Sequence, residues 1–497
     1  MKNSLIVSTI IGLSIILSSC NTKTKRFSKV IDNNIQLEST VLSISVVADS
    51  LNVPWEILWG PDDCIWITEQ KGVISRINPI NGDKKKMLTI PQVWMKRTSG
   101  LLGMAVHPNQ KENPYVFVNY TLEKEGECFS RLERYTFYKD TLMQPKIIFE
   151  IPAGTGHNGS RLTFSRNLQF LYWATGDAAK DGNAQDEKSL NGKILRMNLN
   201  GEIPQDNPTK DSYVWASGLR NVQGLVDASN NNLYASDHGD AIEDEVNLIL
   251  PNGNYGWDVI EGFHDQDNEK EYAELHKNVE PMYSWTPTIA PAGLDYYSSN
   301  KIPEWKNSLL LTTLKGKSLR VLKLNQSGLE IVNEEIYLED VYGRIRDLCV
   351  SPEGDIYIST SNHDWNPMSK PHSTDDRILK ITTVEKAVKV PLRQKETELD
   401  ALKQNTGEIL YEKYCAACHK QDGNGIKEVY PSLIGSSIVQ DKKALISLVL
   451  KGSDNDISMP SFKFLTNEEV GKVLTYVRNS FENKGDSVVE EDIEKFR

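Results

Sequence analysis

Positive charge is in deficit in this sequence. Its 56 lysines and arginines face 68 aspartates and glutamates, which leaves a formal net charge of −12. A nucleic-acid-binding protein needs a basic surface to neutralise phosphates, so the composition argues against such a partner. The chain has 497 residues, enough for roughly two to four domains that each bury a core.

Cysteine is also scarce, with six residues in the whole chain. Three of them belong to the motifs described below, and the other three are Cys64, Cys128 and Cys349. An odd number of thiols cannot all pair. Cys64 and Cys349 lie in apolar, strand-like runs, so we expect them to be buried thiols and expect no disulfide.

The apolar run at the N-terminus, Leu5 to Leu17, is short for a membrane-spanning helix. It has the length of a signal-peptide core, and Lys2 supplies the positive start. The following Leu-Ser-Ser-Cys20 resembles the lipobox of bacterial lipoproteins, whose cysteine is lipidated and becomes the mature N-terminus. The alternative is an ordinary secretory signal with a coincidental cysteine. We expect residues 1–20 to be a lipoprotein-type signal peptide, Cys20 to carry lipid, and the exported chain to be anchored to a membrane in the periplasm or cell envelope.

The sequence Cys415-Ala-Ala-Cys418-His419 is the attachment pattern for c-type haem. Each thiol adds to one haem vinyl group, and the histidine becomes the proximal ligand of the iron. A redox CxxC pair would need a βαβ context, and a zinc site would need a second ligand pair nearby; both are missing. Met459, in Ser-Met-Pro-Ser before a helical stretch, suits the second axial ligand. Export agrees with this prediction, because c-type haem is attached outside the cytoplasm.

Between residues 44 and 383 a turn-rich segment followed by two strands recurs six times, at a spacing of roughly 45–75 residues. The first strand of each copy is apolar and aromatic: 65–68, 115–120, 171–175, 233–236, 308–312 and 356–359. The second alternates apolar and polar residues: 73–77, 130–135, 193–197, 245–249, 319–324 and 377–381. One small sheet cannot bury its own faces, whereas six packed radially can, so the repeat predicts a six-bladed β-propeller. A pair of β-sandwiches would not explain the sixfold recurrence.

The expected fold class is an all-β six-bladed propeller followed by a small all-α cytochrome c domain. The cytochrome domain is expected to open with a helix near 406–414 and to close with one near 467–481. The expected order is a signal peptide at 1–20, a tether at 21–43, the propeller at 44–383, a linker at 384–405, the cytochrome c domain at 406–482 and a charged, frayed tail at 483–497.

Polar residues cluster in the segments that follow blade strands. Gly154-Thr-Gly-His157-Asn-Gly surrounds a histidine with glycines, which shape the backbone there. Asp177 ends another strand, and Arg220 and Asn221 lie in the lead-in to the next blade. A histidine in such a context is a candidate for catalysis, although a lone histidine is more often structural.

Further charged residues follow strands in the later blades. Residues 236–245 are acidic and offer free backbone carbonyls, which suits calcium, although a solvated acidic loop is the alternative. Lys315, Arg344 and Arg346 occupy corresponding loop positions in the last two blades. Three such cations in an acidic protein hint at an anionic ligand, although surface ion pairing is the default role for any one of them.

Several phrases make the resemblance to a known family specific. Residues 50–383 resemble the soluble quinoprotein glucose and aldose-sugar dehydrogenases, the glucose/sorbosone dehydrogenase family. The phrases occur in family order: Trp55-Glu-Ile-Leu-Trp-Gly-Pro-Asp62, Gly100-Leu-Leu-Gly-Met-Ala-Val-His-Pro108, His157-Asn-Gly-Ser-Arg-Leu162, Gly192-Lys-Ile-Leu-Arg196, Arg220-Asn-Val-Gln-Gly-Leu225, Asp244-Glu-Val-Asn247 with Asn254-Tyr-Gly-Trp257, and Arg344-Ile-Arg-Asp347.

This resemblance implies pyrroloquinoline quinone (PQQ), a flat tricarboxylate, at the propeller axis. His157 resembles the general base that takes the proton of the sugar's anomeric hydroxyl while hydride passes to the quinone C5. Asp177 would support this site, and Arg220 would polarise the quinone oxygen where charge develops. The positions that match contacts to cofactor carboxylate or quinone groups are Asn221, Lys315, Arg344 and Arg346.

The resemblance also implies calcium. The backbone carbonyls of Gly239 and Asp240 would hold an ion that bridges protein and cofactor, and Glu245 and Tyr255 match a second, structural position. Three departures bear on cofactor affinity and substrate choice: Gly239-Asp240 replaces Gly-Pro, Thr98-Ser99 replaces a glutamine position, and Val222 replaces proline.

The sequence therefore predicts a PQQ-dependent sugar dehydrogenase that oxidises an aldose-type sugar and passes electrons through haem c to a cytochrome or another respiratory-chain acceptor. One alternative is a non-catalytic carbohydrate- or protein-binding propeller with an electron-transfer cytochrome. Another is the same chemistry on sorbosone-like aldehydes or other alcohols. The presence of both His157 and Arg220 favours an enzyme, because a pure binding protein has no need of that pair.

Overall fold

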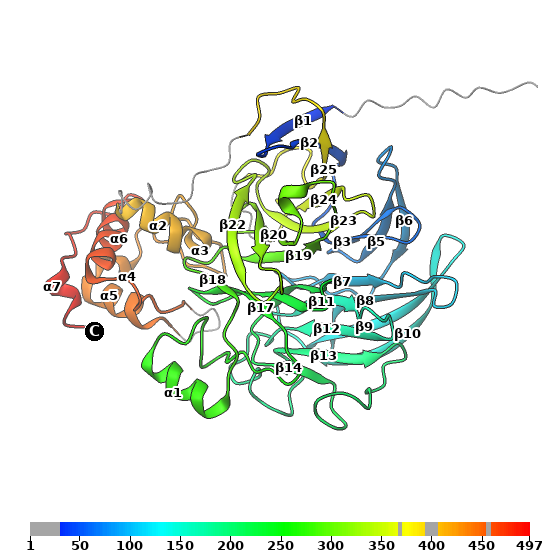
Figure 1. Ribbon diagram of the computed structural model, residues 1–497. Helices are drawn as coiled ribbons and strands as arrows, with labels where there is room; N and C mark the ends of the chain where they lie inside the picture. Colours follow the sequence, from blue (N-terminus) through cyan, green and yellow to red (C-terminus); the bar gives the residue numbers. More distant parts are fainter. Residues whose placement is uncertain (1–29, 366–369, 393–405, 454–458) are drawn as a thin grey trace, which may run out of the picture.

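Six small antiparallel sheets and a separate group of helices make up the protein (Figure 1). The structure is a computed structural model that describes residues 30–365, 370–392, 406–453 and 459–497. The expected signal peptide, Cys20 and most of the expected linker lie outside these residues. The strands occupy the chain up to Val384, and most of the helices follow from Gly407 onward.

Five of the six sheets have four strands each, laid down in chain order as one blade. The first blade contains β3 (Pro54–Trp59), β4 (Ile65–Glu69), β5 (Val73–Ile77) and β6 (Lys84–Thr89). The second contains β7 (Leu101–Val106), β8 (Tyr115–Lys124), β9 (Glu127–Tyr138) and β10 (Thr141–Pro152). The third contains β11 (Gly159–Phe164), β12 (Phe170–Thr175), β13 (Lys193–Asn198) and β14 (Val214–Ser217).

The next two blades follow the same plan. The fourth contains β15 (Val222–Asp227), β16 (Leu233–Asp237), β17 (Asp244–Leu248) and β18 (Tyr283–Trp285). The fifth contains β19 (Pro291–Tyr297), β20 (Ser308–Thr313), β21 (Leu319–Leu324) and β22 (Ile331–Tyr337). The short helix α1 (Asp267–His276) lies in the insertion before β18, and a 3-10 turn at Pro303–Trp305 precedes β20.

The sixth sheet joins the two ends of the propeller. Its order is β1 (Ile31–Gln36), β2 (Val41–Ala48), β25 (Ile378–Val384), β24 (Ile356–Thr360) and β23 (Ile345–Val350). The expected tether at 21–43 therefore contains β1 and the start of β2. The physical reason is that Leu42 and Ile44 are fully buried against the residues of β24 and β25.

The first strands of the blades form a closed ring. Each of β3, β7, β11, β15, β19 and β23 contacts the first strand of the next blade, and β23 returns to β3. Apolar side chains fill the spaces between neighbouring sheets, as in the cluster that joins the fourth and fifth blades. This confirms the predicted six-bladed propeller, in which ligands bind near the axis.

The helical region beyond the propeller has its own hydrophobic core. Its helices are α2 (Gly407–Tyr414), α3 (Ala416–His419), α4 (Ser437–Gln440), α5 (Lys442–Lys451), α6 (Asn467–Asn479) and α7 (Glu490–Ile493). Thr406 caps α2 and Thr466 forms a capping box with Glu469 at α6, close to the expected helix starts. The expected frayed tail instead forms α7, because Ile493 is fully buried in the core.

Two further sequence predictions concern cysteines and membrane spans. The five cysteines that the structure describes are all free, and Cys349 is buried, whereas Cys64 is only half-buried. Within the described ranges, no helix combines the length and the apolar composition that a membrane crossing needs.

Candidate active site

A cavity of about 420 Å³ lies where the loops that follow the blade strands meet the helical region. The propeller supplies most of its lining. The helical region adds Cys418, Tyr430 and Pro460. The cavity therefore has walls from both parts of the chain, and the haem-attachment motif faces the same space as the candidate catalytic residues.

His157 and Asp177 form a hydrogen-bonded pair in the cavity wall. His157 Nδ1 lies 2.9 Å from Asp177 Oδ1, and Asp177 Oδ2 accepts a 2.8 Å hydrogen bond from Trp257 Nε1. Burial alone would raise the pKa of Asp177, but His157 and the charge of Arg220 lower it below its ordinary value. An ionised Asp177 holds the proton on Nδ1 and leaves Nε2 of His157 as the acceptor.

The backbone around His157 is shaped by close contacts. His157 has a φ of 50°, and its carbonyl oxygen accepts a 2.9 Å hydrogen bond from the amide of Ala178. A side chain at Gly176 would meet that carbonyl oxygen at 2.0 Å. Only glycine fits at this point, which explains why the loop brings His157 directly beside the end of β12.

Arg220 and Asn221 lie on the segment that leads into β15. Their amide groups donate 2.9 and 2.6 Å hydrogen bonds to the carboxylate of Asp237. The Arg220 guanidinium donates to Asp240 Oδ1 at 2.7 Å and lies 5.1 Å from the ring centroid of Trp257. Trp257 thus contacts the Arg220 guanidinium and donates a hydrogen bond to Asp177, so it links these two residues.

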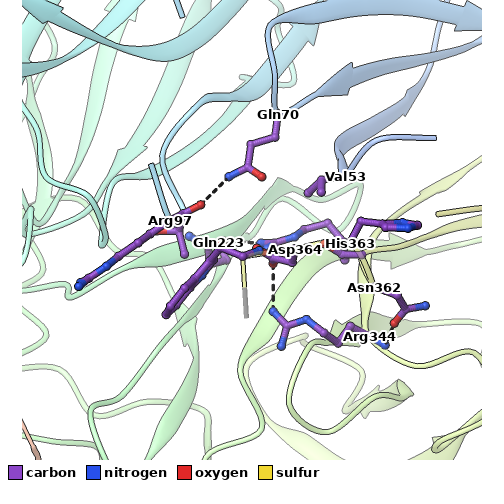
Figure 2. A network of polar contacts seen from close by, with 12 residues as sticks. Val53, Gln70, Arg97, Gln223, Arg344, Asn362, His363 and Asp364 are labelled. Carbon is purple, nitrogen blue, oxygen red and sulfur yellow. Dashed lines mark hydrogen bonds and ion pairs between the residues drawn. The ribbon is translucent and has the colours of Figure 1, made fainter. Parts of the chain in front are cut away.

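Arg344 and Arg346 share one buried carboxylate, that of Asp364. Figure 2 shows Arg344 beside Asp364. Both arginines donate to Asp364 Oδ2, at 3.0 and 2.9 Å, and Arg346 also donates to Gln223 Oε1 at 3.0 Å. Burial would raise the pKa of Asp364, but the two arginines lower it. The pair therefore carries one positive charge more than its bound carboxylate neutralises.

A buried charged cluster forms the floor beneath these residues. Arg161 donates to the carboxylates of Glu56 and, at 3.0 Å, Asp347, and its Nε donates to the Gln223 carbonyl at 2.8 Å. The guanidinium also lies 4.8 Å from the ring centroid of Trp55, which lines the cavity. Burial raises the pKa of both Glu56 and Asp347, although the charge of Arg161 opposes the shift, and the charge of Asp347 raises the pKa of Glu56 further.

The electrostatics of the cavity fit an anionic ligand. Four arginines line it (Arg97, Arg220, Arg344 and Arg346), against two aspartates, Asp240 and Asp364. Among the described residues, three of these arginines have a buried Nε atom without a hydrogen-bond partner: Arg220, Arg344 and Arg346. A buried N–H donor without a partner is costly, and these arginines exceed the carboxylates that bind them, so a bound carboxylate-bearing molecule would stabilise the wall. The donor set therefore fits the tricarboxylate PQQ.

Lys315 stands behind this wall. Its Nζ donates a 2.7 Å hydrogen bond to Thr288 Oγ1. Burial lowers the pKa of Lys315, while the negative charge of Asp244 opposes that shift.

The side chains of Glu245 and Tyr255, at the second predicted calcium position, are engaged within the protein, whereas the prediction for Gly239 and Asp240 concerns their backbone carbonyls. Glu245 accepts from Asn247 Nδ2 and from the amide of Gly262, and the Tyr255 hydroxyl donates to the Leu248 carbonyl. The Gly239 amide donates to Asp244, and the carboxylate of Asp240 binds Arg220. In the part of the chain that the structure describes, no group of three or more His, Cys, Asp or Glu side chains is arranged to hold a metal ion.

The residues of the haem motif lie together at the edge of the helical core. His419 Nδ1 is 3.0 Å from the Pro431 carbonyl, which leaves Nε2 available for iron. Burial lowers the pKa of His419, which favours the neutral ring that a ligand needs. Cys415 and Met459 pack against the same hydrophobic cluster, next to Phe462. This set fits a covalently bound haem with histidine and methionine as axial ligands.

The match to a known family covers most of the chain. Residues 51–367 match the model of the family described as Glucose / Sorbosone dehydrogenase. The chain belongs to this family. A second match, at residues 403–477, is to the model described as Cytochrome C oxidase, cbb3-type, subunit III. The family's propeller and a cytochrome c domain are thus joined in one protein.

Individual relatives agree with both matches. Quinoprotein glucose dehydrogenase B of Acinetobacter calcoaceticus is 29% identical over 404 residues, covering 63% of this chain and 84% of that protein. The PQQ-bound aldose sugar dehydrogenase of Streptomyces coelicolor is 30% identical with a TM-score of 0.60, covering 69% of this chain and 98% of that one. The cytochrome subunit of Gluconobacter japonicus fructose dehydrogenase is 33% identical over 109 residues, covering 19% of this chain and 22% of that subunit.

The structure adds lining residues that the sequence reasoning did not single out. They are Arg97, Gln223, His238, Asp364, Trp365 and Tyr430. Gln223 follows Arg220 and Asn221 closely in sequence, and Asp364 follows a blade strand as the other polar groups do, so both carried a usable signal. Tyr430 carried none, because its place depends on how the helical region packs on the propeller.

Proposed function

We propose that this protein oxidises an aldose-type sugar with bound PQQ and passes the electrons to a covalently attached haem c. The observation that carries the proposal is the shared cavity, which joins an arginine-rich wall, the His157–Asp177 pair and Cys418 of the haem motif. When bound, PQQ would accept the hydride of the substrate and so take up its two electrons.

His157 is proposed as the general base. Its Nδ1 proton is held by the carboxylate of Asp177 at 2.9 Å, so Nε2 accepts the proton of the sugar's anomeric hydroxyl as the hydride leaves. Asp177 is itself fixed by Trp257 and by the amide of Ala179, 2.7 Å from Oδ1. It stabilises the imidazolium that forms and keeps the ring in the productive tautomer.

Arg220 is proposed to stabilise negative charge that develops on the quinone oxygen. Its guanidinium is held by Asp240 and by the face of Trp257, so it needs little reorganisation. Arg344, Arg346 and Asn221 would bind carboxylate or quinone groups of the cofactor. Lys315 would act on the same anionic charge from behind the wall.

The C-terminal domain is proposed to carry the electrons away. Cys415 and Cys418 would form the two thioethers, and His419 and Met459 would be the axial ligands. Haem c, when attached, would accept electrons one at a time and deliver them to a cytochrome or another respiratory-chain acceptor. A domain on the same chain keeps such an acceptor at a high local concentration.

The proposal also includes three parts of the sequence prediction, namely calcium binding, lipidation of Cys20 and the order of the domains. Calcium held by the carbonyls of Gly239 and Asp240, with a second ion at Glu245 and Tyr255, would raise the affinity for PQQ. Residues 1–20 would be removed and Cys20 lipidated, which would anchor the exported protein to a membrane. In the proposed domain order, the propeller starts at Ile31 and is followed by a cytochrome c domain at about 406–482.

Two measurements test the proposal on the purified protein. Added PQQ is expected to raise the melting temperature and to change the absorbance spectrum, and the effect should grow with calcium and shrink with a chelator. A panel of aldoses, sorbosone-like aldehydes and simple alcohols, assayed with an artificial dye as acceptor, identifies the substrate class. If PQQ produces neither a thermal shift nor dye reduction with any of these compounds, the protein is a binding propeller and the proposal fails.

A further inference from the structure

The helical region contacts the propeller at the rim of the cavity through two aromatic rings. Trp365, from the segment after β24, and Tyr430, from the segment after the haem motif, have ring centroids 6.1 Å apart with planes tilted by 38°. Both residues line the cavity. Tilted aromatic pairs at this separation stabilise a contact beyond the area they bury.

The propeller side of this contact is tied to the arginine wall. The Trp365 amide donates a 2.7 Å hydrogen bond to Asp364 Oδ1, and the other oxygen of Asp364 binds Arg344 and Arg346. Arg97 lies 5.9 Å from the Trp365 ring centroid as a cation–π partner. Asp364 therefore links Trp365 directly to the arginines that would bind the cofactor.

The helical side is tied to the haem motif. Tyr430 lines the cavity together with Cys418, one of the two thiols that would attach haem, and the carbonyl of the next residue, Pro431, lies 3.0 Å from His419 Nδ1. Pro460, directly after the candidate ligand Met459, lines the same cavity. A second contact is made by Ala241, which packs against the helical core. Ala241 follows Asp240, whose carboxylate binds Arg220. The Trp365–Tyr430 contact and the Ala241 contact together hold the haem motif toward the cavity.

We propose that the Trp365–Tyr430 contact holds the cytochrome domain over the cavity and forms the route by which electrons reach the haem. The proposal rests on the function proposed above. Electron transfer slows steeply as the gap between donor and acceptor grows, and two touching rings shorten the through-space part of this gap. The two electrons of one substrate molecule leave one at a time. Each reduces ferric haem iron to ferrous iron, a one-electron acceptor outside the chain reoxidises it, and the two protons pass to solvent.

The docking part of the proposal can be tested without PQQ. Full-length, haem-containing protein prepared without PQQ is compared by hydrogen exchange with Trp365→Phe and Trp365→Leu. Amides of residues 426–430 should be protected in the parent protein and in the phenylalanine variant, which keeps a ring. Protection should fall about tenfold or more in the leucine variant. Equal exchange in all three proteins would overturn the docking role.

The electron route is tested after PQQ is added. For each protein, the rate of haem reduction by substrate is divided by the rate of reduction of a dye that takes electrons directly from the cofactor. This ratio should fall about tenfold or more in Trp365→Leu and Tyr430→Leu, equivalent to about 1.4 kcal/mol in the barrier. It should stay near the parent value in Tyr430→Phe. An unchanged ratio in both leucine variants would overturn the route.

The outcomes separate this inference from the proposed function. If the parent protein with PQQ reduces no dye, the dehydrogenase proposal fails, while the exchange experiment still reports on docking. If dye reduction is normal and the ratio is insensitive to both rings, the enzyme stands and only the route is wrong.

Discussion

At the scale of single residues, the central feature is the pairing of an ionised carboxylate with a histidine in the cavity wall. Asp177 is buried, yet its pKa lies below its ordinary value because His157 and Arg220 outweigh the cost of burial. A carboxylate of this kind does not take up the substrate's proton. In the proposed mechanism it directs His157 to do so.

The first prediction concerns this base. His157→Gln should lower the rate of sugar oxidation by about 10²–10⁴-fold, the usual contribution of a general base. The measurement is dye reduction at saturating substrate. Asp177→Asn is the matched variant, with a smaller loss, because the base stays but its tautomer is no longer fixed. PQQ should still raise the melting temperature of both variants, and a loss of that shift would show that the change had damaged the site.

A second prediction concerns Glu56, which shares the guanidinium of Arg161 with Asp347 beneath the cavity. Burial raises the pKa of Glu56 above its ordinary value of 4.5, so the folded protein binds this proton more tightly than the unfolded chain. The contribution of this proton to the free energy of unfolding is therefore fully present below pH values near that ordinary pKa, and it declines as the pH rises above it. Glu56→Gln removes the titrating group. The free energy of unfolding of this variant should fall less than that of the parent between about pH 5 and about pH 9. A parallel fall in both proteins would contradict this assignment.

The site was predictable from sequence only in part. His157, Arg220 and Arg344 lie in segments between strands within recognisable phrases. Arg346, which was expected in a loop, lies within β23, and the structure places all four residues around one cavity. Lys315 shares those signals, but it binds Thr288 behind the wall. Sequence could not show this difference, because it depends on the path of the loop between β20 and β21.

At the scale of elements, closure of the propeller decides how the blades hold together. The last sheet takes β23, β24 and β25 from one end of the propeller and β1 and β2 from the other. Hydrogen bonds between β2 and β25, from Val41 with Val384 onward, hold this ring closed. The sequence predicted the strands of each repeat well because their alternation is local. It assigned 21–43 to a tether, because this stretch is polar and contains lysines. In the structure β1 pairs with β2, and β2 pairs in turn with β25, more than three hundred residues away.

The third prediction tests this closure. Ile44→Ala should lower the free energy of unfolding of the propeller by about 2–5 kcal/mol, because the side chain is fully buried in the sixth sheet. Equilibrium denaturation in urea provides the measurement. Val46→Ala, on the same strand but only half-buried, is the control and should cost less. Equal losses in the two variants would argue that the strand is not a structural part of the sheet.

At the scale of the whole molecule, two units with different chemistry share one cavity. The propeller brings the His157–Asp177 pair and an arginine-rich wall to its axis, and the helical region brings the haem motif to the rim. Each unit was predictable by itself, from the sixfold repeat and from Cys415 to His419. Their mutual placement was not, because it depends on contacts such as Trp365 with Tyr430 that leave no pattern in either segment.

The most direct test follows haem absorbance in full-length, haem-containing protein when an aldose is added without oxygen or dye. With PQQ bound, the haem should become reduced. It should stay oxidised in protein prepared without PQQ, and its reduction should slow by about 10²-fold or more in His157→Gln. A parent protein that reduces dye with the aldose while its haem stays oxidised would contradict the claim that one chain carries electrons from sugar to haem.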